Sequence, residues 1–158
     1  MNGKIVGGFL VLTGLVAGVA MYWLQVYAFY QDASFTPGDE IELTSIESGQ
    51  PEPILVEGIT GIDGDSSPIR FRACFRTPMT LAMLTETYRI YPAPTPLTAP
   101  SWFGCFDAPA IGAALESGEA VAFMGQENIH PGVDRVVAVF ADGRAYAWQQ
   151  LNGSEGNE

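Results

Sequence analysis

Two cysteines are the residues of this sequence best suited to covalent chemistry. Cys74 and Cys105 each open a similar pentapeptide, CFRTP and CFDAP, and each proline would fit the first turn of a helix. In a domain outside the cytoplasm two cysteines usually form a disulfide, so we predict a structural bridge between them. A thiol–disulfide enzyme is the alternative, although the C-x-x-C pair that such enzymes carry at a helix start is absent.

Three arginines form the second candidate site. Arg70, Arg72 and Arg76 lie in the run IRFRACFR at residues 69–76, where apolar residues alternate with the others. A period of two is typical of a strand, so these guanidinium groups would share one face with Cys74. An arginine presents a planar fork of donors, and this face could therefore contact an anion or a carboxylate-bearing partner. Pairing with nearby Asp and Glu side chains is the alternative.

Other catalytic patterns are missing from the sequence. His130 is the single histidine, and one histidine with two cysteines is too few for a typical structural zinc site. There is no C-x-x-C-H for haem attachment, no phosphate-binding glycine loop and no G-x-S-x-G turn. We therefore predict a protein that is not an enzyme, with no catalytic residue, no metal and no cofactor.

An uncharged segment near the N-terminus precedes all of these candidate residues, and it decides where the domain that contains them lies. Residues 5–30 read IVGGFLVLTGLVAGVAMYWLQVYAFY, in which Gln25 is the one strongly polar residue. About 20 apolar residues cross a bilayer, so we predict a membrane anchor over residues 1–30 with its span at about 5–27. A signal peptide cleaved after Ala20 is the alternative, and both interpretations export the domain.

Charge gives this anchor a direction. Lys4 is the only basic residue before the span, and all 18 acidic residues follow it, beginning at Asp32. The positive-inside rule then leaves the N-terminus in the cytoplasm and the domain outside. That outer part holds six basic residues against 18 acidic ones, a formal charge of −12. Such a charge repels nucleic acid and favours basic partners, although acidity is also a common aid to solubility.

One side of the predicted span carries small residues. Gly7, Gly14 and Gly18 recur at intervals of seven and four, which return to the same side of a helix, and Gln25 extends the line. Small residues let a second helix approach closely. We interpret this line as a helix-packing surface for other transmembrane subunits.

The remaining chain predicts an α+β domain with a mainly antiparallel sheet of six or seven strands and two short helices. A linker at residues 31–39 precedes the domain at residues 40–151, and a polar, disordered tail is expected at residues 152–158. A proline-rich connector is expected at 92–100 and a loop at 126–132. Strands are expected at 40–46, 54–56, 69–76, 88–91, 120–125, 134–140 and 144–149, and helices at 79–86 after Thr77 and between Asp107 and Gly118.

Several segments of the sequence resemble those of a known family. MNGKIVGGFL, FRACF, LTETY, WFGCFDAPAIGAALESGEA and DRVVAVFADGRAYAW together resemble an uncharacterised family of small single-span proteins from Rhodobacter-type alphaproteobacteria. The resemblance covers most of the chain to about Leu151. It implies an inner-membrane protein whose domain lies in the periplasm, and it transfers no functional residue.

These features favour a non-catalytic accessory or assembly subunit of an inner-membrane complex, docked through its transmembrane helix. A respiratory complex is a suitable host, because an acidic domain suits a basic periplasmic protein such as a c-type cytochrome. The second hypothesis is a membrane-tethered binding module that uses the arginine face. The third is an enzyme acting through Cys74 and Cys105.

Overall fold

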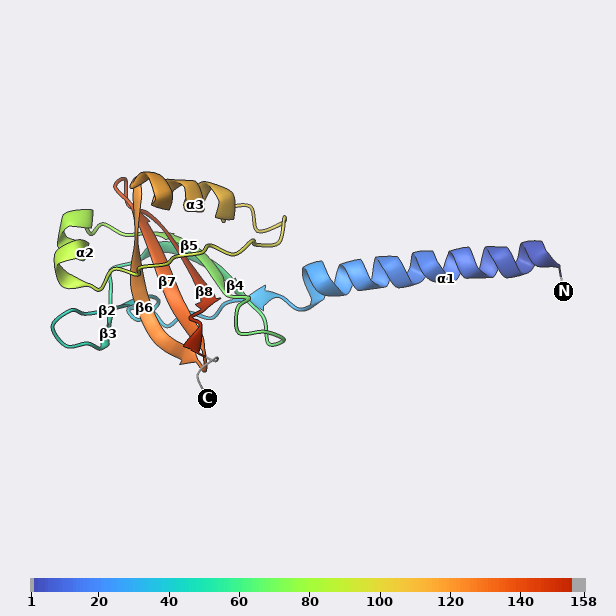
Figure 1. Cartoon of the computed structure of the whole chain (residues 1–158), viewed down its shortest axis with the longest axis horizontal. Helices are drawn as coiled ribbons and strands as arrows, with labels where there is room; N and C mark the ends of the chain where they lie inside the picture. Colours follow the sequence, from blue (N-terminus) through green and yellow to red (C-terminus); the bar gives the residue numbers. More distant parts are fainter. Residues whose placement is uncertain (1, 155–158) are drawn as a thin grey trace.

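A six-stranded antiparallel sheet organises the domain in this computed structural model, which describes residues 2–154 (Figure 1). Its strand order is β1-β4-β5-β8-β7-β6, and β2 pairs with β3 in a separate two-stranded sheet. The predicted α+β class is confirmed. The strands are β1 (Gln31–Asp32), β2 (Glu42–Thr44), β3 (Pro51–Pro53), β4 (Glu57–Asp63), β5 (Arg72–Arg76), β6 (Ala120–His130), β7 (Val133–Phe140) and β8 (Arg144–Leu151).

The long N-terminal helix projects away from this domain (Figure 1). It consists of α1 (Gly3–Trp23) and a five-residue π-helical end, η1 (Leu24–Ala28). Together they form one helix of 26 residues that is long and apolar enough to cross a membrane. Nearly all of its side chains are exposed, as expected of a helix whose apolar surface faces lipid or another helix.

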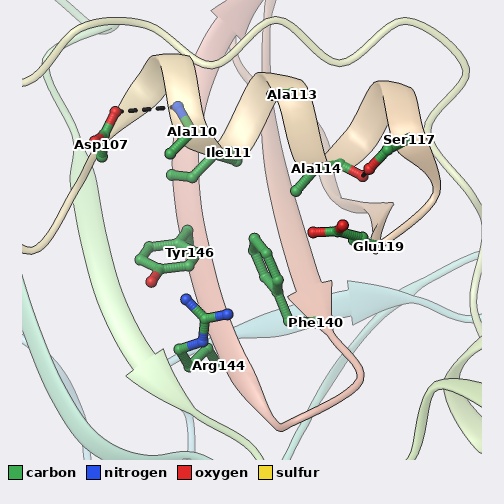
Figure 2. Close-up of a pocket in the computed structure, with 10 residues that line it drawn as sticks. All are labelled: Asp107, Ala110, Ile111, Ala113, Ala114, Ser117, Glu119, Phe140, Arg144 and Tyr146. Carbon is green, nitrogen blue, oxygen red and sulfur yellow. Dashed lines mark hydrogen bonds between the residues drawn. The ribbon is translucent and has the colours of Figure 1, made fainter.

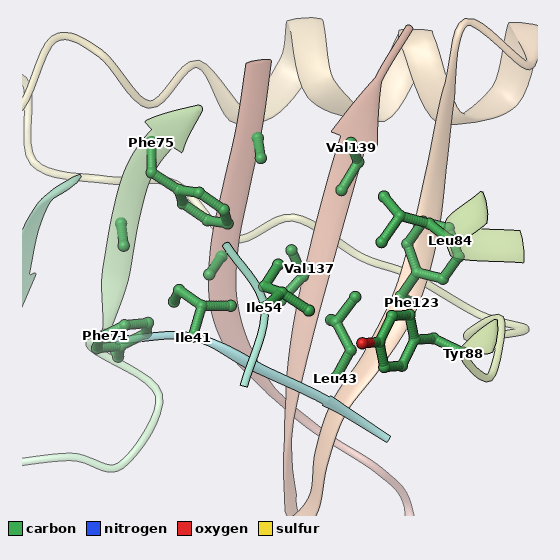
Figure 3. Close-up of a cluster of buried hydrophobic side chains, with 13 residues drawn as sticks. Ile41, Leu43, Ile54, Phe71, Phe75, Leu84, Tyr88, Phe123, Val137 and Val139 are labelled. Atoms are coloured by element: carbon green, nitrogen blue, oxygen red, sulfur yellow. The ribbon is translucent and has the colours of Figure 1, made fainter. Parts of the chain in front are cut away.

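Each face of the large sheet has its own apolar core, because successive strand residues point to opposite sides. Val137 and Val139 face a cluster covered by β2, by Ile54 after β3 and by α2 (Leu81–Thr87), which Figure 3 shows. Val136 and Ala138 face the second cluster, which lies beneath α3 (Ala108–Ser117) and the segment before it. Both faces of the sheet are therefore covered, and the sheet places α2 and α3 on opposite sides.

Turn and capping residues predicted from the sequence explain the β7–β8 hairpin and the ends of α3. The hairpin predicted around Asp142-Gly143 joins β7 to β8, and Gly143 takes a left-handed φ of 86° that glycine adopts without strain. The second helix also begins and ends as predicted. Asp107 accepts a hydrogen bond from the Ala110 N–H over 3.0 Å, and Gly118 follows α3 with φ 80°.

The first helix begins later than predicted. Thr80, and not Thr77, caps α2, since its hydroxyl oxygen accepts a hydrogen bond from the Met83 N–H over 3.3 Å. Thr77 is buried, and its hydroxyl oxygen accepts from the Met79 N–H in the turn before the helix. The two similar pentapeptides differ in structure, because Cys74 lies in β5 and Cys105 lies in a turn, and only the capped helices that follow them are alike.

Several strand boundaries also differ from expectation. The strand expected at 54–56 is wrong, because that segment connects β3 to β4. Residues 126–130 continue β6 through two register irregularities, so the loop expected there is shorter. The linker expected at 31–39 begins with β1, which pairs with β4. The expected strand at 88–91 makes only the isolated bridges of Tyr88 and Ile90. The tail expected at 152–158 lies partly outside the described residues.

Candidate functional site

An aromatic contact joins the helix end to the domain. The indole Nε1–H of Trp102 donates to the backbone carbonyl of Val26 over 2.7 Å. The ring of Tyr27 stacks on the same indole at a centroid distance of 6.2 Å, and Tyr30 meets it edge-on at 5.9 Å. We call this contact the junction. It connects the end of the apolar helix directly to the segment that precedes α3.

Arg70 belongs to the junction as well. Its guanidinium lies over the rings of Phe29 and Tyr30, 5.4 and 5.0 Å from their centroids. Such stacking is favourable because the ring face is electron-rich. The buried Nη1 of Arg70 has no hydrogen-bond partner among the described residues. Arg70 therefore faces the helix end rather than an open anion-binding surface.

A small cleft lies beside the junction, between the helix end and the proline-rich connector. Its volume is about 300 Å³. Gln25 lines it, together with Tyr22, Val26, Tyr30 and residues 98–101. The polar end of the predicted helix-packing line thus opens onto the domain.

The glycines of the predicted helix-packing line are not covered by any other segment of the described chain. Around Gly7, Gly14 and Gly18, apart from the adjoining residues and the backbone of the helix itself, no atom of the described residues lies within 4 Å of where a side-chain carbon would stand. These glycines leave the backbone uncovered along one side of α1, and no other segment of the described chain packs against it. A second helix could approach the backbone there.

Arg72 lies in the interior, although the sequence suggested an exposed face. It is 4% exposed. Its guanidinium donates to the carbonyls of Leu97 at 2.8 Å and Thr98 at 3.2 Å, and also to those of Ile69 and Phe71. Burial lowers the pKa of Arg72 to about 10. Arg72 holds the proline-rich connector against the sheet and is not available to a ligand.

Arg76 lies at the end of β5. It is exposed, and it stands directly opposite Arg144 in the pairing of β5 with β8. Asp142 separates the two charges: its backbone carbonyl accepts from Arg76 Nη2 at 2.6 Å, and its carboxylate lies 2.7 Å from Arg144 Nε. Arg72 and Arg76 lie on the same side of β5, as predicted, but they do not form one exposed arginine surface, because Arg72 is buried and Arg70 precedes the strand.

A groove runs beneath α3 beside this pair (Figure 2). We call it the α3 groove. Its volume is about 690 Å³. One wall is the small-residue side of α3, and the other is the end of the β7–β8 hairpin. It is lined by Asp107, Ala110, Ile111, Ala113, Ala114, Ser117, Glu119, Phe140, Arg144 and Tyr146.

Comparison with models of protein families assigns the domain that contains this groove to a family. Residues 41–157 match the model of DUF6446, a family of unknown function. The chain belongs to the DUF6446 family. No curated protein and no solved structure matches it. An uncharacterised family was expected, and the match confirms this. The matched DUF6446 region contains the α3 groove, Arg72 and Trp102, whereas α1 and η1 precede it.

The predicted disulfide is present in this DUF6446 domain. Cys74 and Cys105 are joined with their Cα atoms 6.3 Å apart, within the usual range for a disulfide. The bridge ties β5 to the turn that leads into α3, and it therefore fixes one end of the α3 groove. Among residues 2–154, no group of three or more His, Cys, Asp or Glu side chains is placed to hold a metal ion.

A buried network behind β6 was not foreseen from the sequence. Asp134 is 3% exposed and accepts hydrogen bonds from the Tyr91 hydroxyl, the Asn128 N–H and the Asn152 amide. It holds Asn128 in a left-handed conformation, φ 48°, where β6 departs from regular pairing. No local pattern marks Asp134, since its three partners come from three separate segments. The same applies to Trp102 and Arg144, which only the folded chain brings to their sites.

Proposed function

We propose that this DUF6446 protein is a non-catalytic accessory or assembly subunit of an inner-membrane complex, docked through α1. The observation that carries the proposal is the open line of Gly7, Gly14 and Gly18 on an apolar helix. In lipid, helices associate by close packing and by polar contacts, and this line offers both with Gln25 at its end.

The junction supports the same function. Trp102 and Arg70 attach the domain to the last turns of the helix through rings and one hydrogen bond. A flexible linker would let the domain sample many positions, whereas this attachment limits them. A subunit that docks by its helix would therefore present its domain at a defined angle to the host complex.

Charge favours a basic neighbour on the outer side. The domain carries 18 acidic residues against six basic ones, and the few charges around the span favour a periplasmic domain. An acidic surface attracts basic proteins and increases their rate of encounter. A respiratory complex that works with a basic c-type cytochrome fits this proposal.

The test is co-purification of the tagged full chain from native membranes in mild detergent, followed by native mass measurement. The variant Gly14→Leu/Gly18→Leu fills the line, and Ala20→Leu places one leucine side chain about 140° around the helix. We expect partner subunits to co-purify with the wild type and with Ala20→Leu. We expect the double variant to lose them by about tenfold or more, which corresponds to about 1.4 kcal/mol.

Two results would count against the proposal. The wild type could purify only as a monomer without other subunits, or the double variant could retain its partners as well as Ala20→Leu does. Membrane insertion of all variants is checked by their resistance to carbonate extraction, so that loss of a partner is not confused with loss of the anchor.

A membrane-tethered binding module is the second candidate, and one observation favours it. The α3 groove offers a cavity of about 690 Å³ beside Arg144. The basic residue that lines this groove is Arg144, with Arg76 as its cross-strand neighbour, and not the row of three arginines expected from the sequence.

A further inference from the structure

The α3 groove remains open because the helix above it carries small side chains. Ala110, Ala113, Ala114 and Ser117 form the side of α3 that faces the groove (Figure 2). Larger side chains at these positions would fill the space between the helix and the hairpin. The volume of about 690 Å³ lies in the range that small-ligand sites occupy.

Arg144 is held in place at the floor of the groove. Asp142 binds its Nε over 2.7 Å, and its guanidinium lies over the Phe140 ring at 4.6 Å. Figure 2 shows the guanidinium between Phe140 and Tyr146, directed toward α3. Because the Nε edge is bound to Asp142, the terminal nitrogens form the edge that a ligand can reach. A guanidinium fixed in this way loses little freedom when it binds a carboxylate.

The surrounding charges limit what can bind. Arg76 stands beside Arg144 and adds a second positive charge, which Asp142 partly offsets. Asp107 and Glu119 line other parts of the groove and would repel further negative charge. This balance favours a ligand with one negative group and disfavours polyanions such as nucleic acid.

Most of the remaining lining is apolar, apart from the hydroxyl groups of Ser117 and Tyr146. Ile111 and Ala114 are buried in the core beneath the helix and border the groove, and Phe140 closes its other side. Apolar atoms placed here would leave water and gain free energy in proportion to the area covered. The groove thus combines one positioned cation with an apolar wall.

We propose that the α3 groove binds a monocarboxylate with an apolar body, with the carboxylate on the terminal nitrogens of Arg144 and the body against Ile111, Ala114 and Phe140. Two sources share this chemistry, a free organic acid and the carboxyl end of a polypeptide. This inference is independent of how α1 docks in the membrane.

The test measures binding to the full chain in neutral detergent micelles by calorimetry. The probes are 4-phenylbutyrate and an acetylated tetrapeptide that ends in valine-leucine, each compared with its carboxamide. We expect at least one acid to bind about tenfold or more tightly than its amide, because only the acid can form charged hydrogen bonds with Arg144. Binding of one acid alone identifies the source, and either outcome supports the proposal.

Three variants locate the site. Arg144→Gln removes the charge and should weaken acid binding about tenfold or more, whereas Ala113→Leu fills the groove without changing Arg144 and should weaken acid and amide alike. Arg89→Gln is the matched control, since Arg89 is also about half exposed and paired with a carboxylate but lies outside the groove. It should bind as the wild type does.

The proposal is overturned if neither acid binds, if acid and amide bind equally, or if Arg144→Gln binds like the wild type. Circular dichroism and thermal unfolding establish that each variant is folded. If Arg144→Gln fails to fold, Ala113→Leu decides the question, because retention of wild-type affinity in that variant would exclude the groove.

Discussion

Trp102 donates its indole N–H to the backbone carbonyl of Val26 over 2.7 Å, across 76 positions of sequence. Val26 lies in η1, where the helix turns are wider than in α1. Short π-helical segments often occur at functional positions, and this one lies where the apolar helix meets the domain. Trp102 therefore connects the apolar helix to the domain through this carbonyl and through the rings of Tyr27 and Tyr30.

Trp102→Phe should loosen this connection while retaining an aromatic ring. The lost hydrogen bond corresponds to about 1 kcal/mol, so we expect backbone amides at residues 24–32 to exchange with deuterium about fivefold faster. Hydrogen exchange with mass spectrometry in lipid nanodiscs measures this. Tyr22→Phe is the control, since the Tyr22 hydroxyl makes no hydrogen bond within the described residues. Equal exchange in wild type and Trp102→Phe would show that the contact does not hold the junction.

Arg72 and Arg76 should respond differently to the same kind of substitution. Arg72→Met leaves four backbone carbonyls without their donor and should lower the free energy of unfolding by about 3 kcal/mol. Arg76→Gln changes an exposed side chain and should alter it by less than about 0.5 kcal/mol. Urea unfolding followed by circular dichroism compares them. Similar effects would mean that Arg72 does not hold the connector.

The disulfide should contribute strongly to stability. Cys74→Ala with Cys105→Ala releases a loop of 31 positions, for which chain entropy gives about 3–4 kcal/mol. We expect a lower urea midpoint and, in the wild type, no thiol that reacts under denaturing conditions before reduction. The reduced wild type should have a urea midpoint close to that of the double variant. Two reactive thiols in the unreduced protein would contradict the bridge.

The sequence predicted best those elements whose ends are set by neighbouring residues. Asp107 and Gly118 bound α3, and Asp142-Gly143 turns the β7–β8 hairpin, each through contacts within a few positions. The disulfide was predictable because only two cysteines were available. In each case the residues that decide the structure are local or few.

Elements that depend on distant partners were missed. β4 has two glycines and a weak alternation, and it is a strand because β1 and β5 pair with its two edges. Arg72 is buried because the connector that carries Leu97 lies over it. The pairing of Arg76 with Arg144 depends on the register of β5 with β8. Alternation placed Arg72 on the correct face of β5, but it could not show that this face is covered.

Tyr91 gives the protein a specific sensitivity to alkaline pH. Its hydroxyl donates to Asp134 over 3.1 Å, and burial, followed by the negative charge of Asp134, raises the pKa of Tyr91 to about 12. The phenol is thus more strongly protonated in the folded than in the unfolded chain. Its contribution to stability is present below about pH 10 and is lost as pH rises toward 12. The loss should be about 1 kcal/mol between pH 9 and 11.

Tyr91→Phe removes the titrating group and should make the free energy of unfolding less dependent on pH in this range. At pH 8 the variant should be about 1 kcal/mol less stable than the wild type, because the hydrogen bond to Asp134 is gone. The difference should shrink by about 1 kcal/mol at pH 11, since only the wild type then loses the contribution of a protonated phenol. Urea midpoints at pH 8, 9, 10 and 11 measure both values, and other titrating groups cancel in the comparison. A difference that stays constant with pH would contradict the raised pKa of Tyr91.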